Sequence, residues 1–178
     1  MQKKKLLLCA MLFIPLCLHA EFTFQPKYVG DVHLGYGSST KVDGMNAYIQ
    51  RVGVGTVQGV SLNEWIQVGI GVDFNFYTHY YPKSISIYKP YSGLRMDMNE
   101  YIDLRGTYSF LEDFKVYLDL GLGVVHNVRH TGMEGANFFC QFGPGLQWKH
   151  LDFSFGLQSY VNDGNGVNTF FAKIGYCF

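Results

Sequence analysis

Residues 167–178, the last twelve of the 178-residue chain, read V-N-T-F-F-A-K-I-G-Y-C-F. Apolar side chains occupy the even positions from Phe170 to Phe178, whereas Thr169, Lys173 and Gly175 at odd positions are polar or small. Alternation with a period of two residues predicts a β-strand with one apolar and one polar face. We therefore expect this segment to be the closing strand of a small membrane-spanning barrel.

The same alternation recurs in seven upstream segments. It is clearest in residues 114–124 and 65–77, and weaker in residues 28–37, 48–58, 101–110, 137–148 and 151–160. Eight strands is the number that a minimal closed barrel needs. The predicted fold class is all-β, an eight-stranded antiparallel up-and-down transmembrane β-barrel.

The segments between the predicted strands alternate in length. Short turns lie near residues 61–64, 111–113 and 149–150, and longer loops near residues 38–46, 78–98, 127–136 and 161–166. This alternation is typical of outer-membrane barrels with both termini on the periplasmic side. Glu100 is expected at the lipid boundary, with residues 93–99 above the membrane. A ten-stranded alternative makes residues 84–88 a separate strand.

The amino terminus has the pattern of a targeting segment. Lys3, Lys4 and Lys5 precede the apolar run of residues 6–18, and Ala20 supplies a small residue before a cleavage point. This predicts a cleaved signal peptide over residues 1–20 and one barrel domain over residues 21–178. The alternative is an uncleaved anchor helix, but the run is shorter than the ~20 apolar residues that span a bilayer.

Composition and cysteine placement narrow the class further. Without the three leader lysines, 11 basic residues face 14 acidic ones, so nothing indicates a nucleic-acid partner. The 21 glycines, 13 tyrosines and 15 phenylalanines suit a curved barrel with aromatic belts. Export permits a disulfide, but Cys140 is predicted to face outward and Cys177 inward on non-adjacent strands. Both are expected to be free thiols.

The polar faces carry most of the charge. A soluble barrel would have an apolar interior and a wet exterior, whereas here the apolar faces are almost uncharged, as lipid contact requires. We interpret the polar faces as an ion network that plugs the lumen, with an ion or proton path as the alternative. Its predicted members are Asp31, His33, Arg51, Asp73, Asp103, Arg105, Lys115, Asp119 and Lys173, with Asp152 also inward.

Register arguments predict particular pairs inside the lumen. Around the turn at residues 111–113, Arg105 falls opposite Asp119, in position for a buried ion pair. The other two predictions place Lys173 near Asp31, and Arg51 near Asp31, His33, Asp73 and Asn75.

Two clusters are candidates for binding. His126 and His130 flank Arg129 in the third long loop, where a solvated loop is expected rather than a metal site. Tyrosines gather around the second long loop, where an interfacial belt is expected and a recognition surface is the alternative. These residues are Tyr77, His79, Tyr80, Tyr81, Tyr88 and Tyr91. Any extracellular ligand is expected at residues 79–98.

The predicted lipid face offers little for catalysis. Its polar residues are Gln50, Thr56, Cys140, Ser159 and Asn168, no histidine is predicted there, and no G-x-S-x-G elbow occurs. We expect no enzyme activity, cofactor or metal, and a structural or surface-recognition role. The alternatives are a lipid-modifying acyl hydrolase or transferase, and a narrow pore.

Apolar-glycine repeats carry a family resemblance. They occur at residues 52–55, 68–71 and 120–123, with related runs at 143–146 and 173–178. With these motifs the chain resembles the OmpA/OmpX-like and opacity-protein-like superfamily of small outer-membrane barrels, in its Gly-rich Bacteroidetes form. The chain shows no peptidoglycan-binding domain after the barrel, so envelope tethering is not carried over.

The resemblance implies a location in the bacterial outer membrane among its lipids, and roles in adhesion or envelope integrity. It also implies Sec export and insertion by the barrel-assembly machinery. The residues matching the family's assembly signal are Phe170, Ile174, Tyr176 and Phe178.

Overall fold

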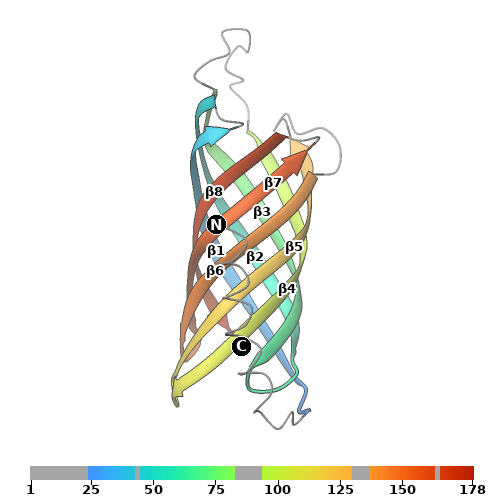
Figure 1. The fold of residues 1–178 in the computed structure, drawn as a ribbon, viewed down its shortest axis with the longest axis vertical. Coiled ribbons are helices and arrows are strands. Elements are labelled where there is room, and N and C mark those ends of the chain that lie inside the picture. Colours follow the sequence, from blue (N-terminus) through green and yellow to red (C-terminus); the bar gives the residue numbers. More distant parts are fainter. Residues whose placement is uncertain (1–23, 43–44, 83–93, 130–136, 163–164) are drawn as a thin grey trace, which may run out of the picture.

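The chain folds into a closed barrel of eight antiparallel strands, seen in a computed structural model that describes residues 24–42, 45–82, 94–129, 137–162 and 165–178. Each strand pairs with its neighbours in sequence, and β8 closes on β1 (Figure 1). The strands are β1 (Lys27–Val42), β2 (Met45–Ser61), β3 (Ile66–Pro82), β4 (Met96–Leu111), β5 (Phe114–Arg129), β6 (Asn137–Trp148), β7 (Leu151–Asn162) and β8 (Asn165–Cys177). The predicted eight-stranded topology is confirmed.

The ten-stranded alternative is wrong for this barrel, because β3 pairs directly with β4. Residues 84–88 themselves lie outside the described part of the chain. No described helix has the length and apolar character to cross a bilayer.

Closure joins the first and last strands at the periplasmic end of the barrel. Phe178 N donates to Gly30 O at 2.9 Å, and Gly30 N donates to Phe178 O at 3.0 Å. The Phe178 ring also packs against Tyr28, with ring centroids 6.2 Å apart. Because the ladder closes, no strand edge is left with unpaired backbone groups.

Two of the predicted long loops are strands instead. β1 continues to Val42 and β2 begins at Met45, so residues 38–46 belong almost wholly to a hairpin. β7 and β8 likewise extend to Asn162 and Asn165. The prediction failed because apolar alternation reports contact with lipid, whereas ladder hydrogen bonds continue beyond the lipid with polar side chains.

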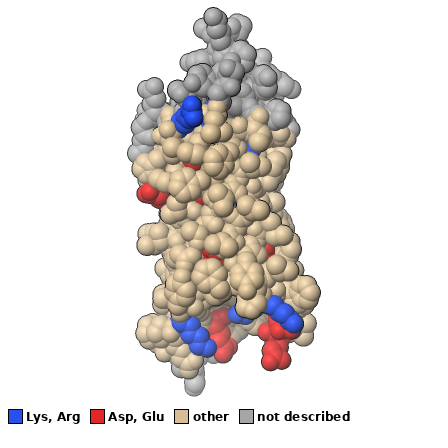
Figure 2. Space-filling view, turned by 180° about the vertical axis from the view of Figure 1, so that it is seen from behind, with Lys and Arg blue, Asp and Glu red and all other residues tan. Residues whose placement is uncertain are grey.

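The outer surface is apolar around the whole barrel. Each strand contributes an exposed large hydrophobic residue: Leu34, Val54, Ile70, Ile102, Leu122, Phe142, Phe155 and Phe170. Figure 2 shows a broad, mostly tan zone in the middle of the barrel with only small red patches, and the largest group of charged side chains lies below it at the lower end. A surface of this kind exceeds what a soluble monomer exposes and suits a hydrocarbon environment.

Aromatic rings and short turns mark the periplasmic end. Trp65 packs against Tyr108 and Phe114 against Trp148, with ring centroids 5.6 Å and 6.0 Å apart. In the β2–β3 turn, Asn63 Oδ1 accepts hydrogen bonds from the backbone amides of Trp65 and Ile66, each at 2.8 Å. Rings at this level form the interfacial girdle that such barrels carry.

Candidate functional site in the barrel interior

His33 lies inside the barrel between two carboxylates. Its Nδ1 is 2.7 Å from Asp31 Oδ1, and its Nε2 is 2.9 Å from Asp73 Oδ1. All three residues are buried. A neutral imidazole donates from only one ring nitrogen, so contact of both nitrogens with carboxyl oxygens suits the imidazolium form. This bridge connects β1 to β3 past the intervening strand β2.

Glycine on β2 makes the bridge possible. A Cβ at Gly55 would collide with Asp73 Oδ1 and lie 2.6 Å from His33 Nε2. A Cβ at Gly37 on β1 would lie 2.6 Å from Arg51 Nε. The alternating glycines of the motif at residues 52–55 therefore include one that leaves room for a lumen ion pair.

Lys173 extends the bridge to β8. Its Nζ lies 3.0 Å from Asp73 Oδ2, 3.1 Å from Gln141 Oε1 and 3.4 Å from the hydroxyl oxygen of Tyr101. The predicted contact with Asp31 is wrong, because the seam register places Lys173 opposite Gly35 and Asp31 opposite Cys177. The lysine reaches across the lumen instead of along the seam.

Arg51 lies one layer further from the periplasmic end. Its register partners are Gly37 on β1 and Tyr77 on β3. Its Nη2 donates to Gln158 Oε1 and, at 3.0 Å, to Thr169 Oγ1. The predicted proximity is confirmed in part, since Arg51 borders one small space with His33, Asp73 and Asn75. The proximity to Asp31 is wrong, because the β1–β2 register pairs His33 with Gly55 and Arg51 with Gly37.

A second polar cluster at this level was not predicted from the sequence. Asp97 accepts hydrogen bonds from Asn75 Nδ2, at 2.8 Å, and from the Tyr77 hydroxyl. Asp97 is fully buried inside the barrel. Asp97 lies an even number of residues from Asp103 on the same strand, and this spacing alone indicates that both side chains point inward. Tyr77 correspondingly belongs to the lumen, and the interfacial-belt interpretation is wrong for this tyrosine.

Arg105 joins the centre of the lumen to its periplasmic half. It stands opposite Asp119, as the register argument predicted, with Nε 3.3 Å from Asp119 Oδ1. The contact is not bidentate, because Nη2 turns to Asp31 Oδ2 at 3.5 Å. The guanidinium also lies over the Tyr117 ring, 4.2 Å from its centroid, and Tyr117 donates to Asp152 Oδ2 at 2.7 Å.

Three residues predicted for the ion network, Arg51, Asp103 and Lys115, make no ion pair with any described residue. Lys115 stands opposite Ser109 and Gln147 near the end of the barrel. Asp103 is 3% exposed, and its Oδ1 has no hydrogen-bond partner. Uncharged residues also make hydrogen bonds inside the lumen, and the pattern of charges did not predict them. They are Tyr101, Gln141, Gln158 and Thr169.

His126 faces outward on β5, with Nε2 3.5 Å from Glu100 Oε2 on β4. Both side chains are about half exposed, at 46% and 48%. The prediction that His126 lies in the third long loop is wrong, because β5 runs to Arg129. His130 lies outside the described residues, and no cluster of three or more metal-binding side chains occurs within them.

The two cysteines and the closing aromatics lie where the strand phases predict. Cys140 is partly exposed, Cys177 is buried, and both are free thiols. The residues proposed as an assembly signal all face outward: Phe170, Ile174, Tyr176 and Phe178, which are 48–72% exposed. Of the tyrosine cluster, Tyr88 and Tyr91 lie outside the described residues, as do the side chains of His79, Tyr80 and Tyr81.

Solved barrels share this fold. The crystal structure of the outer membrane enzyme PagL matches with a TM-score of 0.55 and 12% identity, covering 82% of this chain and 98% of that one. Neisserial surface protein A matches with a TM-score of 0.50 and 13% identity, covering 86% and 99%. Ail, the attachment invasion locus protein of Yersinia pestis, matches with a TM-score of 0.48 and 16% identity, covering 85% and 99%. No family model and no curated protein sequence matches the chain.

The apolar outer surface, the polar interior and the shared fold define the class. The chain is a small membrane-spanning β-barrel of the bacterial outer-membrane type.

Proposed function

We propose that this protein is an outer-membrane barrel with a plugged lumen, acting in envelope structure or surface recognition through the connections at its extracellular end. The observation that carries the plug is the reach of Lys173 across the lumen to Asp73 and Gln141. With the His33–Asp73 and Arg105–Asp31 pairs, these contacts cross-link strands that are not neighbours in the barrel. The space left among His33, Arg51 and Lys173 is only about 10 Å³, too little for a water-filled channel.

Conductance in planar lipid bilayers tests the plug. The unaltered protein is expected to give no steady current. Replacing Lys173 and Gln141 together by alanine removes the cross-lumen contacts, and a small current is expected from that variant. Steady conductance of the unaltered protein at neutral pH contradicts the plug and favours the pore alternative.

Surface recognition is proposed for the connection between β3 and β4, within residues 79–98. It is the longest connection between consecutive strands, and tyrosine-rich surfaces favour recognition. Bacteria carrying the chain without residues 83–93 are expected to lose attachment to immobilised extracellular-matrix proteins. A matched deletion of residues 112–113, at the opposite end, serves as the control. Equal attachment by the 83–93 deletion and the unaltered protein speaks against this role.

A catalytic role is the competing function, and the Glu100–His126 pair is its best candidate. An acyl hydrolase needs a nucleophile beside such a pair. The described outward neighbours carry no hydroxyl or thiol: they are Val72, Phe74, Met98, Val124 and Val128. We therefore propose a non-catalytic role. Fatty-acid release from lipid A vesicles that disappears in His126→Ala would overturn it.

Biogenesis is proposed to follow the outer-membrane route, with Sec export and insertion by the barrel-assembly machinery. The outward aromatic side chains of β8 support this route. Phe178 also completes the backbone ladder through its hydrogen bonds with Gly30. Deleting Phe178 is expected to reduce assembly in cells several-fold. Heat-modifiability on gels of outer-membrane fractions measures it, and Phe155→Leu, on the same outer surface, provides a control.

A further inference from the structure

Five ion pairs join six side chains into one chain across the barrel interior. Each member contacts the next at 2.7–3.5 Å, and the members come from strands β1, β3, β4, β5 and β8. Along it, carboxyl groups alternate with groups that can carry positive charge. In order, the members of this ion chain are Lys173, Asp73, His33, Asp31, Arg105 and Asp119.

Protonation of His33 decides the charge balance of the ion chain. Three carboxyl groups lie along it, whereas its basic side chains other than His33 are Arg105 and Lys173. With a proton on both ring nitrogens, His33 balances the third carboxylate and donates to Asp31 and Asp73. With one proton, it leaves a ring lone pair facing a carboxylate oxygen, and the buried ion chain carries an uncompensated negative charge.

The strands around His33 bring no other described titratable group within hydrogen-bond distance of its ring. Gly55 and Gly175 stand opposite His33 on the neighbouring strands β2 and β8. Lys173 repels a charged imidazole, but its ammonium lies against Asp73, the carboxylate that His33 also contacts. The remaining titratable groups of the surrounding inner wall are Arg51 on β2, Tyr101, Asp103 and Arg105 on β4, Tyr117 and Asp119 on β5, Asp152 on β7 and Cys177 on β8. The two carboxyl groups that contact the ring therefore govern its second proton.

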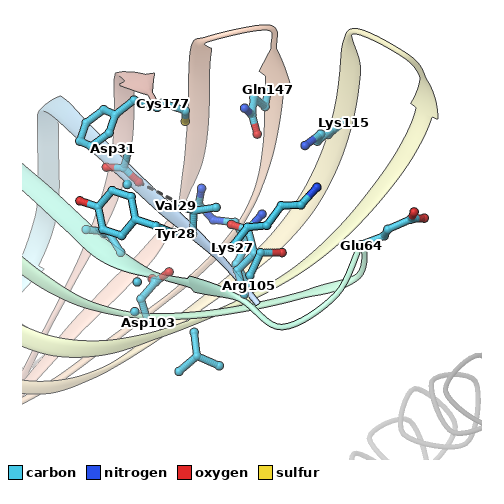
Figure 3. Close-up of a pocket in the computed structure, with 18 of the residues that line it drawn as sticks. Lys27, Tyr28, Val29, Asp31, Glu64, Asp103, Arg105, Lys115, Gln147 and Cys177 are labelled. Carbon is cyan, nitrogen blue, oxygen red and sulfur yellow. Dashed lines mark hydrogen bonds and ion pairs between the residues drawn. The ribbon is translucent and has the colours of Figure 1, made fainter. Parts of the chain in front are cut away.

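A cavity of about 780 Å³ lies in the periplasmic half of the barrel interior and reaches the ion chain. Asp31 and Arg105 are among the residues that line it, and a dashed line in Figure 3 marks the contact between them. Asp31 in turn accepts from His33 Nδ1. On its other side, His33 borders a space of only about 10 Å³ with Asp73 and Lys173. The larger opening for a proton that leaves His33 is therefore the periplasmic cavity, by way of Asp31.

We propose that His33 is a proton-operated lock between β1 and β3. In its doubly protonated form, the imidazole holds Asp31 and Asp73 together. When one proton leaves toward the periplasmic cavity, one of the two contacts is lost, while Arg105 keeps Asp31 and Lys173 keeps Asp73. The stabilising effect of the lock is present on the acidic side of the His33 titration and lost on its alkaline side. The lock concerns the barrel wall, so it does not depend on the proposed surface role.

Nitrogen-15 NMR of the protein, labelled at histidine and folded in detergent micelles, tests the protonation state. At neutral pH, the His33 ring is expected to show two protonated nitrogens, and in alkali it is expected to lose one of these protons while the barrel stays folded. Replacing the other histidines one at a time assigns the signals. A ring with one proton at neutral pH overturns the proposal, and so does a ring that keeps both protons until the barrel unfolds.

Urea unfolding across the same pH range tests the lock. From neutral to alkaline pH, the unfolding equilibrium constant of the unaltered protein is expected to rise about tenfold more than that of His33→Gln, because glutamine has no ring proton to lose. His126→Gln, on the outer surface, is the matched control and should keep the pH dependence of the unaltered protein. Equal pH dependence of folded His33→Gln and the unaltered protein contradicts the lock. Should His33→Gln fail to fold, the NMR titration of the unaltered protein decides the question.

Discussion

Lys173 and Lys115 both point into the barrel, but their surroundings differ. At the centre, the Lys173 ammonium lies within 3.4 Å of three acceptors, from Asp73, Gln141 and Tyr101. At the periplasmic end, Lys115 has no described ion-pair partner and borders the cavity. The same residue type is therefore enclosed by acceptors in one layer and without an ion-pair partner among the described residues in the other.

The physical difference between the two regions is access to water. A charge enclosed by side chains must find protein partners, because nothing else replaces its hydration. A charge that borders an open cavity keeps water until a ligand displaces it. Four substitutions can break or sharpen this comparison, and urea unfolding in detergent micelles measures each of them.

Arg105→Ala is expected to have the largest effect, a loss of about 4 kcal/mol in the free energy of unfolding. Asp31 and Asp119 both lose a buried cation, and Tyr117 loses the guanidinium above its ring. The double variant with Asp119→Leu should be less destabilised than additivity predicts, since the stranded charge is also gone. An unchanged unfolding midpoint for Arg105→Ala would mean that the central layer contributes no stability.

Lys173→Met is expected to cost about 3 kcal/mol, because Asp73 keeps His33 and Tyr101 but loses its only lysine. Lys115→Met is the matched control in the cavity, with an expected change near zero. Equal destabilisation by both substitutions would erase the distinction between the two regions.

Gly55→Ala is expected to cost about 2 kcal/mol through overpacking. The new methyl group collides with Asp73 and crowds His33, so the bridge between β1 and β3 must shift. Gly106→Ala provides the control, since a Cβ at that position meets no atom within 4 Å. A wild-type unfolding curve for Gly55→Ala would show that the bridge can move freely.

Asp103→Asn is expected to have the smallest effect, a change of about 1 kcal/mol or less, toward greater stability. The substitution changes a buried carboxyl whose Oδ1 has no hydrogen-bond partner, and it keeps the shape of the side chain. Asp73→Asn, at the centre, should destabilise by several times more, because His33 and Lys173 lose their shared carboxylate. Clear destabilisation by Asp103→Asn would reveal a partner for this side chain.

Much of the fold followed from the alternation of side chains. The number of strands and the inward or outward direction of their side chains were predictable from this alternation. The Arg105–Asp119 register was predictable because a short turn leaves little freedom in the pairing of its two strands. The extracellular ends of the strands were not predictable. The outer parts of β1, β2, β7 and β8 are held by backbone hydrogen bonds, which the side-chain pattern does not report. The register of the β1–β2 hairpin, in which Gly37 stands opposite Arg51, then determined where Arg51 lies.

In the closing strand, the contributions of the sequence and of the tertiary structure can be told apart. The sequence by itself determined that residues 167–178 form a two-faced strand, with Phe170, Ile174, Tyr176 and Phe178 on one face and Lys173 on the other. Only the tertiary structure decided that Lys173 contacts Asp73 rather than Asp31. Strand stagger and side-chain length set contacts across a lumen, and neither is encoded in the spacing of residues along one strand. The same reason explains why the cavity at Asp103 becomes visible only after the barrel closes.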